Sequence, residues 1–150
     1  MNDSEEAAKA AREASHSLQS ARESDKSNAL RAIHASLQSS KEFILAANAK
    51  DLALAKEGSL SESLVKRLDL NLSGKWESLL EGILQVEALD DPTGKVQLAT
   101  RLDEGLDLYR VSCPIGVLLI IFEARPEVVV QISCLAIKSG VCLNGCLCVE

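Results

Sequence analysis

Apolar residues recur at helical spacing through the first 89 residues of the chain. Alanine fills five of the eight positions from 7 to 14, which favours a helix by intrinsic propensity. The next segment places Leu30, Ile33, Leu37 and Ile44 close to one helical stripe. A later stripe, with spacings of three and four, is typical of a helix with one face in a core: Trp76, Leu79, Leu80, Ile83 and Leu84. The pattern predicts an N-terminal half built of amphipathic helices.

Glycines and small polar residues mark where these helices begin and end. Gly58 suits a C-terminal cap, and either Ser59 or Ser61 suits the N-cap of a short helix that follows. Glu62 completes a capping box if Ser59 is the cap, and Ser73 suits the N-cap of the next helix. The short helix has an apolar face formed by Leu64, Val65 and Leu68. We therefore expect a short helix between two longer ones.

A turn-rich segment from Asp90 to Gly94 ends the helical half and is the main internal boundary of the chain. Apolar residues then alternate with polar or small ones from 96 to 102 and again from 106 to 110. The segment 103–105, with its glycine, forms a turn between the two runs. The alternation predicts an antiparallel β-hairpin.

From Ile115 to Phe122 the alternation gives way to a continuous apolar run. Such a run is typical of a strand buried on both faces of a parallel sheet. Pro126 suits the first position of a following helix, the segment 128–137 is apolar almost all round, and Gly140 suits its C-terminal cap. With the extended segment that begins after it, this pattern predicts an α/β fold with an incomplete βαβ unit.

Composition and charge exclude several classes of function. The chain has 16 Lys and Arg residues against 22 Asp and Glu residues, a formal net charge of -6, and no basic run, so a nucleic-acid surface is not expected. Aromatic residues make up 3% of the chain, too few for a platform that stacks bases. The acidic start lacks the features of a secretory or transit signal, and the longest apolar run is too short to span a bilayer. We expect a cytoplasmic protein that binds neither nucleic acid nor membrane.

The five cysteines do not form a recognisable metal-binding set. Cys113 and Cys134 fall in apolar surroundings and are expected to be small core residues. Cys142, Cys146 and Cys148 form a C-x3-C-x-C cluster near the end of the sequence, but a fourth ligand is missing and no histidine lies near. Because no secretory signal precedes them, we expect free thiols and no bound metal.

The junction between the apolar run and the next helix suits an anion. In open α/β sheets, ligands bind beyond the carboxyl ends of the strands, where residues 122–125 are expected to lie. A helix N-terminus offers unpaired N–H groups and the positive end of its dipole, and Arg125 adds a cation beside it. The alternative is structural: Arg125 pairs with Glu123, Glu127 or a more distant acid, and Phe122 packs in the core. The residues alone leave both interpretations open.

The same junction carries a resemblance to a known family. The segment 114–128 resembles the start of the cofactor domain of γ-glutamyl phosphate reductases, and Glu-Ala-Arg-Pro at 123–126 is its most specific part. Further similarity follows in the same order along the chain, in segments 44–52, 60–64, 84–96 and 135–140. The resemblance covers residues 8–140, and on it the chain is identified as a member of this family.

The resemblance implies an aldehyde-dehydrogenase-like fold, in which residues 1–140 form the N-terminal part of a nicotinamide-binding α/β domain. It implies NADPH as the cofactor, bound by Phe122, Glu123, Ala124, Arg125 and Pro126. It also implies a reaction of proline biosynthesis in which a cysteine thiolate attacks L-glutamate 5-phosphate, phosphate leaves, and NADPH reduces the thioester to L-glutamate 5-semialdehyde. Family members carry that cysteine in a separate catalytic domain and use a small β extension in oligomers, so no catalytic residue is expected here.

The resemblance breaks after Gly140. Family members continue with an asparagine, a short apolar strand and a basic residue followed by two glycines, whereas residues 141–150 form a divergent tail in which Asn144 and Gly145 predict a turn. We therefore expect a truncated cofactor domain, a fragment that lacks reductase activity and is at best marginally folded. The alternative is a non-catalytic interaction module, which binds a partner, forms a homo-oligomer or pairs with full-length reductase subunits.

Overall fold

The chain folds as a helical first half, a hairpin and one βαβ unit. The computed structural model describes residues 3–58, 60–72, 74–123 and 125–148, with the side chains of residues 3, 4, 123 and 144–148 left out. In chain order the elements are α1 (Asp3–Gln19), α2 (Glu23–Ser39), α3 (Lys41–Glu57), α4 (Glu62–Leu68), α5 (Lys75–Ala88), β1 (Val96–Asp103), β2 (Leu106–Val111), β3 (Val117–Glu123), α6 (Pro126–Ser139) and β4 (Cys142–Cys148). This order matches the α/β class that the sequence predicts.

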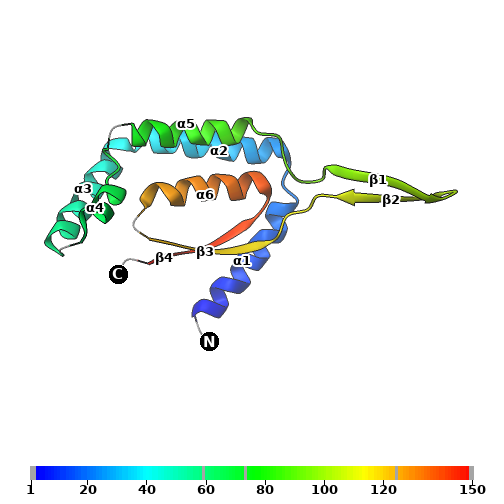
Figure 1. Cartoon of the computed structure of the whole chain (residues 1–150), viewed down its shortest axis with the longest axis horizontal. Coiled ribbons are helices and arrows are strands. Elements are labelled where there is room, and N and C mark those ends of the chain that lie inside the picture. The colour runs from blue at the N-terminus through cyan, green and yellow to red at the C-terminus, as the bar shows by residue number, and fades with distance from the viewer. Residues whose placement is uncertain (1–2, 59, 73, 124, 149–150) are drawn as a thin grey trace.

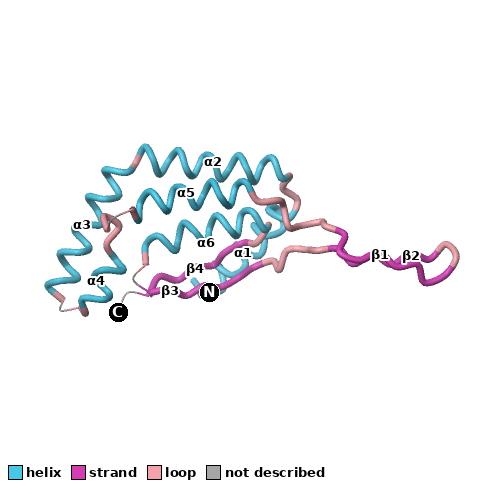
Figure 2. Tube along the Cα trace, turned by 45° about the horizontal axis from the view of Figure 1, so that its top comes forward, coloured by secondary structure: helices cyan, strands magenta, loops and turns pink. Residues whose placement is uncertain are grey.

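Three helices from distant parts of the chain pack together, and one of them, α6, lies between the other two and a two-stranded sheet (Figure 1). α2 contacts both α5 and α6, α5 contacts α6, and α6 lies against β4. α1 contacts β4 and β3 from the side of the strand pair away from α6 in Figure 1. α3 and α4 pack together at one end of the molecule, and the β1–β2 hairpin projects from the other (Figure 2).

The core lies where α2, α5 and α6 meet. Leu30, Ile83 and Cys134, one from each helix, are at most 1% exposed. Burial of each large apolar side chain contributes roughly 1.5–3 kcal/mol, so this contact holds the three helices together. Partly buried residues pack around it: Ile33, Leu37, Leu80, Val86, Val130 and Ile137. The stripe predicted for α5 is confirmed from Trp76 to Ile83, whereas Leu84, 44% exposed, lies off the buried face.

The helix ends agree with the sequence in part. The stripe predicted over residues 30–44 is divided between two helices at Ser40, which is both the C-cap of α2 and the N-cap of α3. Gly58 is the C-cap of α3, as predicted. Ser61 caps α4, and its hydroxyl accepts a hydrogen bond from the backbone three residues on, which decides between the two candidates. The other candidate, Ser59, and the cap predicted at Ser73 lie outside the described residues.

The last two strands complete a parallel βαβ unit. β3 and β4 pair in parallel along their whole length, with α6 as the crossover. The turn predicted at Asn144 and Gly145 is wrong, because these residues pair with Leu119 and Ile120 in the ladder. The Asn-Gly preference for a turn is local, and strand pairing with a neighbour overrides it here.

β3 is covered on one face only. Leu118 and Ile120 line a cavity together with Ile132 of α6, whereas Leu119 and Ile121 are 65% and 66% exposed. The prediction of a strand buried on both faces is therefore wrong. Its physical reason is that α6 shields one face, while on the other face α1 lies mainly against β4.

The predicted antiparallel hairpin is confirmed. β1 and β2 pair from Val96 opposite Val111 to Asp103 opposite Leu106. The turn between them contains Gly105, whose φ of 78° lies in the left-handed region that glycine adopts without strain. Every residue of both strands is exposed, and the hairpin stands clear of the helices in Figure 2.

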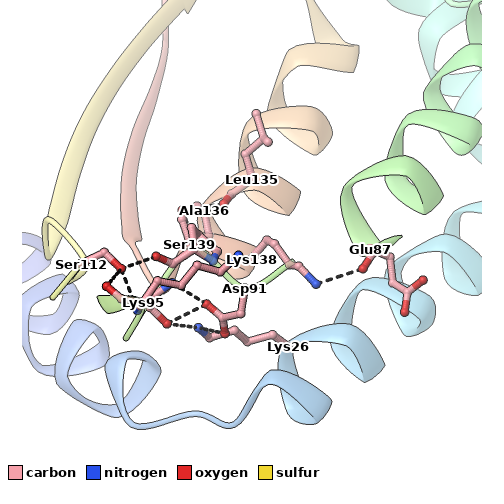
Figure 3. Close-up of polar contacts among 11 residues, drawn as sticks. Lys26, Glu87, Asp91, Lys95, Ser112, Leu135, Ala136, Lys138 and Ser139 are labelled. Carbon is pink, nitrogen blue, oxygen red and sulfur yellow. Dashed lines mark hydrogen bonds and ion pairs between the residues drawn. The ribbon is translucent and has the colours of Figure 1, made fainter. Parts of the chain in front are cut away.

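A buried polar cluster joins the hairpin base to the helices (Figure 3). Lys26 Nζ of α2 donates to Asp91 Oδ2 at 2.8 Å and to Thr93 Oγ1 at 3.3 Å. Gly140, the C-cap of α6, has a φ of 68°, and a Cβ added there would lie 3.1 Å from Pro114 Cγ and 3.6 Å from Lys26 Nζ. The start of α2, the segment after α5 and the end of α6 therefore meet at one point.

Candidate functional site

A concave surface rich in cationic side chains lies where α4, α5 and the β3–α6 junction meet. Its volume is about 560 Å³, within the range of small-molecule sites. We call it the basic pocket and define it by its lining residues: Glu62, Ser63, Lys66, Arg67, Lys75, Arg125 and Glu127. Four cationic and two acidic side chains give it a positive excess, in a chain whose net charge is -6.

Each wall of the basic pocket is fixed by local structure. Lys75 is the first residue of α5 and follows Gly74, whose φ of 76° places the turn before the helix in the left-handed region. Arg125 is the N-cap of α6, directly before Pro126. Buried Asn48 of α3 accepts from the Leu70 amide at 3.0 Å and donates to the Leu68 carbonyl at 2.9 Å. These two hydrogen bonds hold the end of α4, which carries Lys66 and Arg67, against α3.

Two of the four cations in the basic pocket are paired. Lys66 Nζ lies 2.7 Å from Glu62 Oε1, and Lys75 Nζ lies 3.3 Å from Glu127 Oε1. Lys75 Nζ also donates to the backbone carbonyl of Arg67 at 2.6 Å. Among the side chains that the structure describes, the guanidinium groups of Arg67 and Arg125 form no ion pair. These two guanidinium groups could therefore pair with an anionic ligand.

The second carboxylate oxygen of Glu127 is a further polar group without a partner. Glu127 Oε2 is buried and accepts no hydrogen bond from the described part of the chain. The side chain as a whole is 16% exposed. A buried carboxylate oxygen without a donor costs about 1–3 kcal/mol, so a ligand that donates to it would be stabilised.

Of the five residues predicted at the cofactor site, the structure brings one into the basic pocket. Arg125 lines it, Pro126 starts α6 beside it, and Phe122 is half-buried near the end of β3. Glu123 is the last residue of β3, with its side chain among those left out, and Ala124 lies outside the described residues. Glu127, one of the acids that the structural alternative offered to Arg125, pairs with Lys75 instead.

Sequence reasoning missed Lys66, Arg67 and Lys75. They precede Arg125 by 50 residues or more and belong to a helical region with no recognisable motif. One sequence signal was present: the Lys-Arg doublet directly follows the apolar pair Leu64 and Val65 on a short helix. Because the apolar pair faces the core, the doublet is expected to face away from it. Its proximity to Arg125 is a property of the tertiary fold.

The cysteines fall into different environments. Cys134 is a buried core residue, as predicted, and burial raises the pKa of its thiol. Cys113 is exposed, so the prediction of a core position is wrong: it lies in the extended segment between β2 and β3, outside any helix packing. Cys142 is half-buried, and the side chains of Cys146 and Cys148 are among those left out.

In residues 3–58, 60–72, 74–123 and 125–148 no group of three or more His, Cys, Asp and Glu side chains is placed to hold a metal ion. Within the same ranges, no helix has both the length and the apolar character needed to cross a bilayer.

Fold and pocket together define a class: an α/β chain with a basic pocket just beyond the carboxyl end of β3, the edge at which open α/β sheets bind ligands. No family model matches the chain. Individual proteins do. It is 51% identical over 140 residues to a Schizosaccharomyces pombe protein named a probable gamma-glutamyl phosphate reductase, with 91% of this chain and 31% of that protein covered. It is 49% identical over 140 residues to the gamma-glutamyl phosphate reductase of Saccharomyces cerevisiae, with 93% of this chain and 31% of that protein covered.

Solved structures agree. The crystal structure of gamma-glutamyl phosphate reductase from Saccharomyces cerevisiae matches 97% of this chain and 38% of its own, with a TM-score of 0.93 and 47% identity. The crystal structure of the enzyme from Thermotoga maritima matches 95% of this chain and 34% of its own, with a TM-score of 0.89 and 37% identity. The chain belongs to the γ-glutamyl phosphate reductase family, and it matches the N-terminal part of these enzymes. It spans about a third of the length of the curated relatives it matches.

Proposed function

We propose that the chain supplies the N-terminal part of a γ-glutamyl phosphate reductase in the cytoplasm. The reaction of the complete enzyme is the NADPH-dependent reduction of L-glutamate 5-phosphate to L-glutamate 5-semialdehyde with release of phosphate, a step of proline biosynthesis. Identity of 45–51% to proteins of that name, over nearly the whole of this chain, supports the proposal. In this role residues 1–140 contribute the N-terminal part of a cofactor domain.

The observation that carries the proposal is the position of Arg125. It stands at the N-cap of α6, just after β3, and no described side chain caps that helix. Free N–H groups at a helix N-terminus and a guanidinium both favour phosphate oxygens. NADPH carries three phosphate groups, so residues 122–126 fit as a contact with this cofactor, which when bound supplies the hydride.

We further propose that the chain alone does not reduce the substrate. Thioester formation needs a cysteine that is both ionised and accessible. Cys134 meets neither condition, because it is 1% exposed and its burial raises the thiol pKa. Cys113 is exposed, but neither it nor Cys142 lines the basic pocket. Among the cysteines whose side chains the structure describes, none is thus both accessible and placed in the basic pocket, and the role proposed for the chain is to bind and position ligands.

Equilibrium titration with NADPH, followed by its fluorescence, tests this proposal. Wild-type protein should bind NADPH without consuming it in the presence of L-glutamate 5-phosphate. Arg125→Ala should weaken binding by about tenfold, the loss expected for one charge-assisted contact, whereas Arg12→Ala on exposed α1 should not. Equal affinity of wild type and Arg125→Ala, or turnover by the chain alone, would contradict the proposal.

A second candidate function is association through the β1–β2 hairpin. Its strands are exposed at every position, including six apolar side chains that are each at least 48% exposed: Val96, Leu98, Leu102, Leu106, Leu108 and Val111. Exposed apolar strands of this kind mark interaction surfaces. The partner would be a second copy of this chain or a full-length reductase subunit.

Sedimentation velocity over a range of concentrations tests this second candidate. The double variant Leu98→Asp and Leu108→Asp should abolish self-association and capture by the full-length enzyme. The matched control Gln97→Asp adds one charge to the same strand and should leave association unchanged. A wild-type chain that stays monomeric and does not bind full-length reductase would rule out this function.

A further inference from the structure

A second pocket lies at the other end of α6 from Arg125, beside the segment that follows α5. Its volume is about 600 Å³, again within the range of small-molecule sites. We call it the Lys138 pocket, and its main lining residues are Leu89, Asp90, Pro92, Leu135, Lys138 and Ser139. It shares no lining residue with the basic pocket, and α6 separates the two by about 20 Å at 1.5 Å per residue. The two pockets are therefore separate sites.

Lys138 brings a buried cation to this pocket. Its side chain is 3% exposed, and its Nζ donates to the Glu87 carbonyl at the end of α5 at 2.9 Å (Figure 3). An ammonium has three N–H donors, and this carbonyl is its one hydrogen-bond acceptor in the part of the chain that the structure describes. A carbonyl at a helix C-terminus carries only a partial negative charge. Because a buried cation is costly unless a full charge faces it, Lys138 is only partly compensated.

The acids in the segment that Lys138 reaches are engaged by other cations. The three ion pairs are Arg31 with Glu87 at 2.6 Å, Lys95 with Asp90 at 3.0 Å, and Lys26 with Asp91 at 2.8 Å. Among the described side chains, Lys138 itself forms no ion pair. This corner of the fold therefore carries one surplus positive charge, and it is buried.

The remaining wall of the Lys138 pocket is mainly apolar. Leu89, the C-cap of α5, is 56% exposed, and Leu135 of α6 is 51% exposed. Exposed leucines beside a hollow offer apolar surface to the body of a ligand. The hydroxyl of Ser139 already donates to the Leu135 carbonyl at 2.6 Å. The lining thus offers one cation and an apolar wall.

We infer that the Lys138 pocket binds a small monocarboxylate with an apolar body. The carboxylate pairs with the ammonium of Lys138, and the hydrocarbon part lies against Leu89 and Leu135. A phosphate dianion fits less well, because no second cation is among the lining residues and Asp90 adds a negative charge. The site lies outside the proposed function, since it uses neither residues 122–126 nor any residue of the basic pocket.

Titration of the complete 150-residue chain, followed by NMR of its backbone amides, tests the inference. The probe is 4-methylpentanoate, and its comparison is 4-methylpentanamide, which has the same apolar body without the charge. The carboxylate should bind about tenfold more tightly and shift the amides of residues 88–92 and 135–139. Lys138→Met keeps the apolar stem and should remove the difference. The matched control Lys50→Met, on the exposed side of α3, should keep it.

A second pair of variants leaves Lys138 in place. Leu135→Glu changes an exposed side chain, so it should not disturb the core, and it puts a carboxylate on the wall of the pocket. It should weaken binding of 4-methylpentanoate by about tenfold, because the new carboxylate competes for the ammonium. Leu84→Glu, at a 44% exposed position outside the pocket, is the control and should bind like wild type. Circular dichroism and thermal melts of both variants should match wild type.

Three results would overturn the inference. The first is equal affinity of wild type for the carboxylate and the amide. The second is tighter binding of 3-methylbutylphosphonate than of 4-methylpentanoate, which would indicate a site for a dianion. The third is displacement of 4-methylpentanoate by NADPH, or shifts confined to residues of the basic pocket, which would place both ligands at one site. The NADPH titration of the Arg125→Ala variant decides the proposed function separately.

Discussion

Lys26 and Asp91 form an ion pair of 2.8 Å although they stand 65 positions apart in the sequence. Their side chains are 2% and 14% exposed. Burial raises the pKa of the Asp91 carboxyl, but hydrogen bonds from Lys26 and Thr93 outweigh that cost and lower its pKa to about 2. The pair fixes the segment between α5 and the hairpin against α2. It is therefore one of the contacts that hold the base of the hairpin against the helices.

This pair predicts a loss of stability in acid. The pKa of Asp91 falls from 3.8 to about 2 on folding, so the unfolded chain takes up the proton first as the pH is lowered. The contribution is fully present above about pH 4 and lost as the pH falls through about 2, and it amounts to about 2 kcal/mol. Urea unfolding at several pH values in this range measures it. Asp91→Asn should flatten the profile there; an unchanged profile would refute the assigned role.

Removal of the buried cation should cost more than removal of an exposed one. Lys26→Met leaves Asp91 partly buried without its counterion, which is expected to lower the free energy of unfolding by about 3 kcal/mol. Lys9→Met breaks the exposed pair with Glu5 and is expected to cost less than about 1 kcal/mol. Thermal or urea unfolding of both variants gives the comparison. Equal effects would show that the buried pair has no special role.

Alanine at two glycines should change stability in opposite directions. Gly140 has a φ of 68°, and an added Cβ would lie 3.1 Å from Pro114 Cγ, so Gly140→Ala is expected to destabilise by about 1–3 kcal/mol. Gly82 lies inside α5 with no atom within 4 Å of such a Cβ. Gly82→Ala should therefore stabilise by about 0.5–1 kcal/mol. Urea unfolding decides, and effects of the same sign would contradict the packing described.

The cysteines should differ sharply in reactivity. Cys113 is exposed, whereas Cys134 is 1% exposed with a thiol pKa raised by burial. In the native protein a thiol reagent should modify Cys113 rapidly and Cys134 only after unfolding. Mass spectrometry of peptides after timed labelling measures both sites, with Cys113→Ser as the control. Rapid native labelling of Cys134 would show that the helical core opens.

The helices of the fold follow from local sequence pattern, whereas the burial of the strands does not. The stripe from Trp76 to Ile83 and the caps at Gly58 and Gly140 were predictable, because helical spacing and a glycine at a helix end leave a direct trace in the sequence. The apolar run of β3 predicted burial on both faces, yet Ile121 is 66% exposed. The exposure of a strand depends on which elements pack on its two faces, and the composition of the strand does not determine that.

The site was predictable only where it lies in a recognisable junction. Arg125 follows an apolar strand and precedes a proline at a helix start, so its position was expected. Arg67 and Lys75 reach the same pocket from a separate helical region, and only the tertiary fold brings them there. Lys138, in the last turn of α6, likewise reaches across the fold: its Nζ donates to the Glu87 carbonyl at the end of α5, at 2.9 Å.

Amide hydrogen exchange of the whole chain, with and without NADPH, measures whether the junction of β3 and α6 binds the phosphate-bearing cofactor, as we propose. NADPH should slow exchange in residues 120–130, and Arg125→Ala should remove that protection. Exchange in the hairpin, residues 96–111, should stay unchanged. Protection confined to other segments, or none at saturating NADPH, would contradict the account.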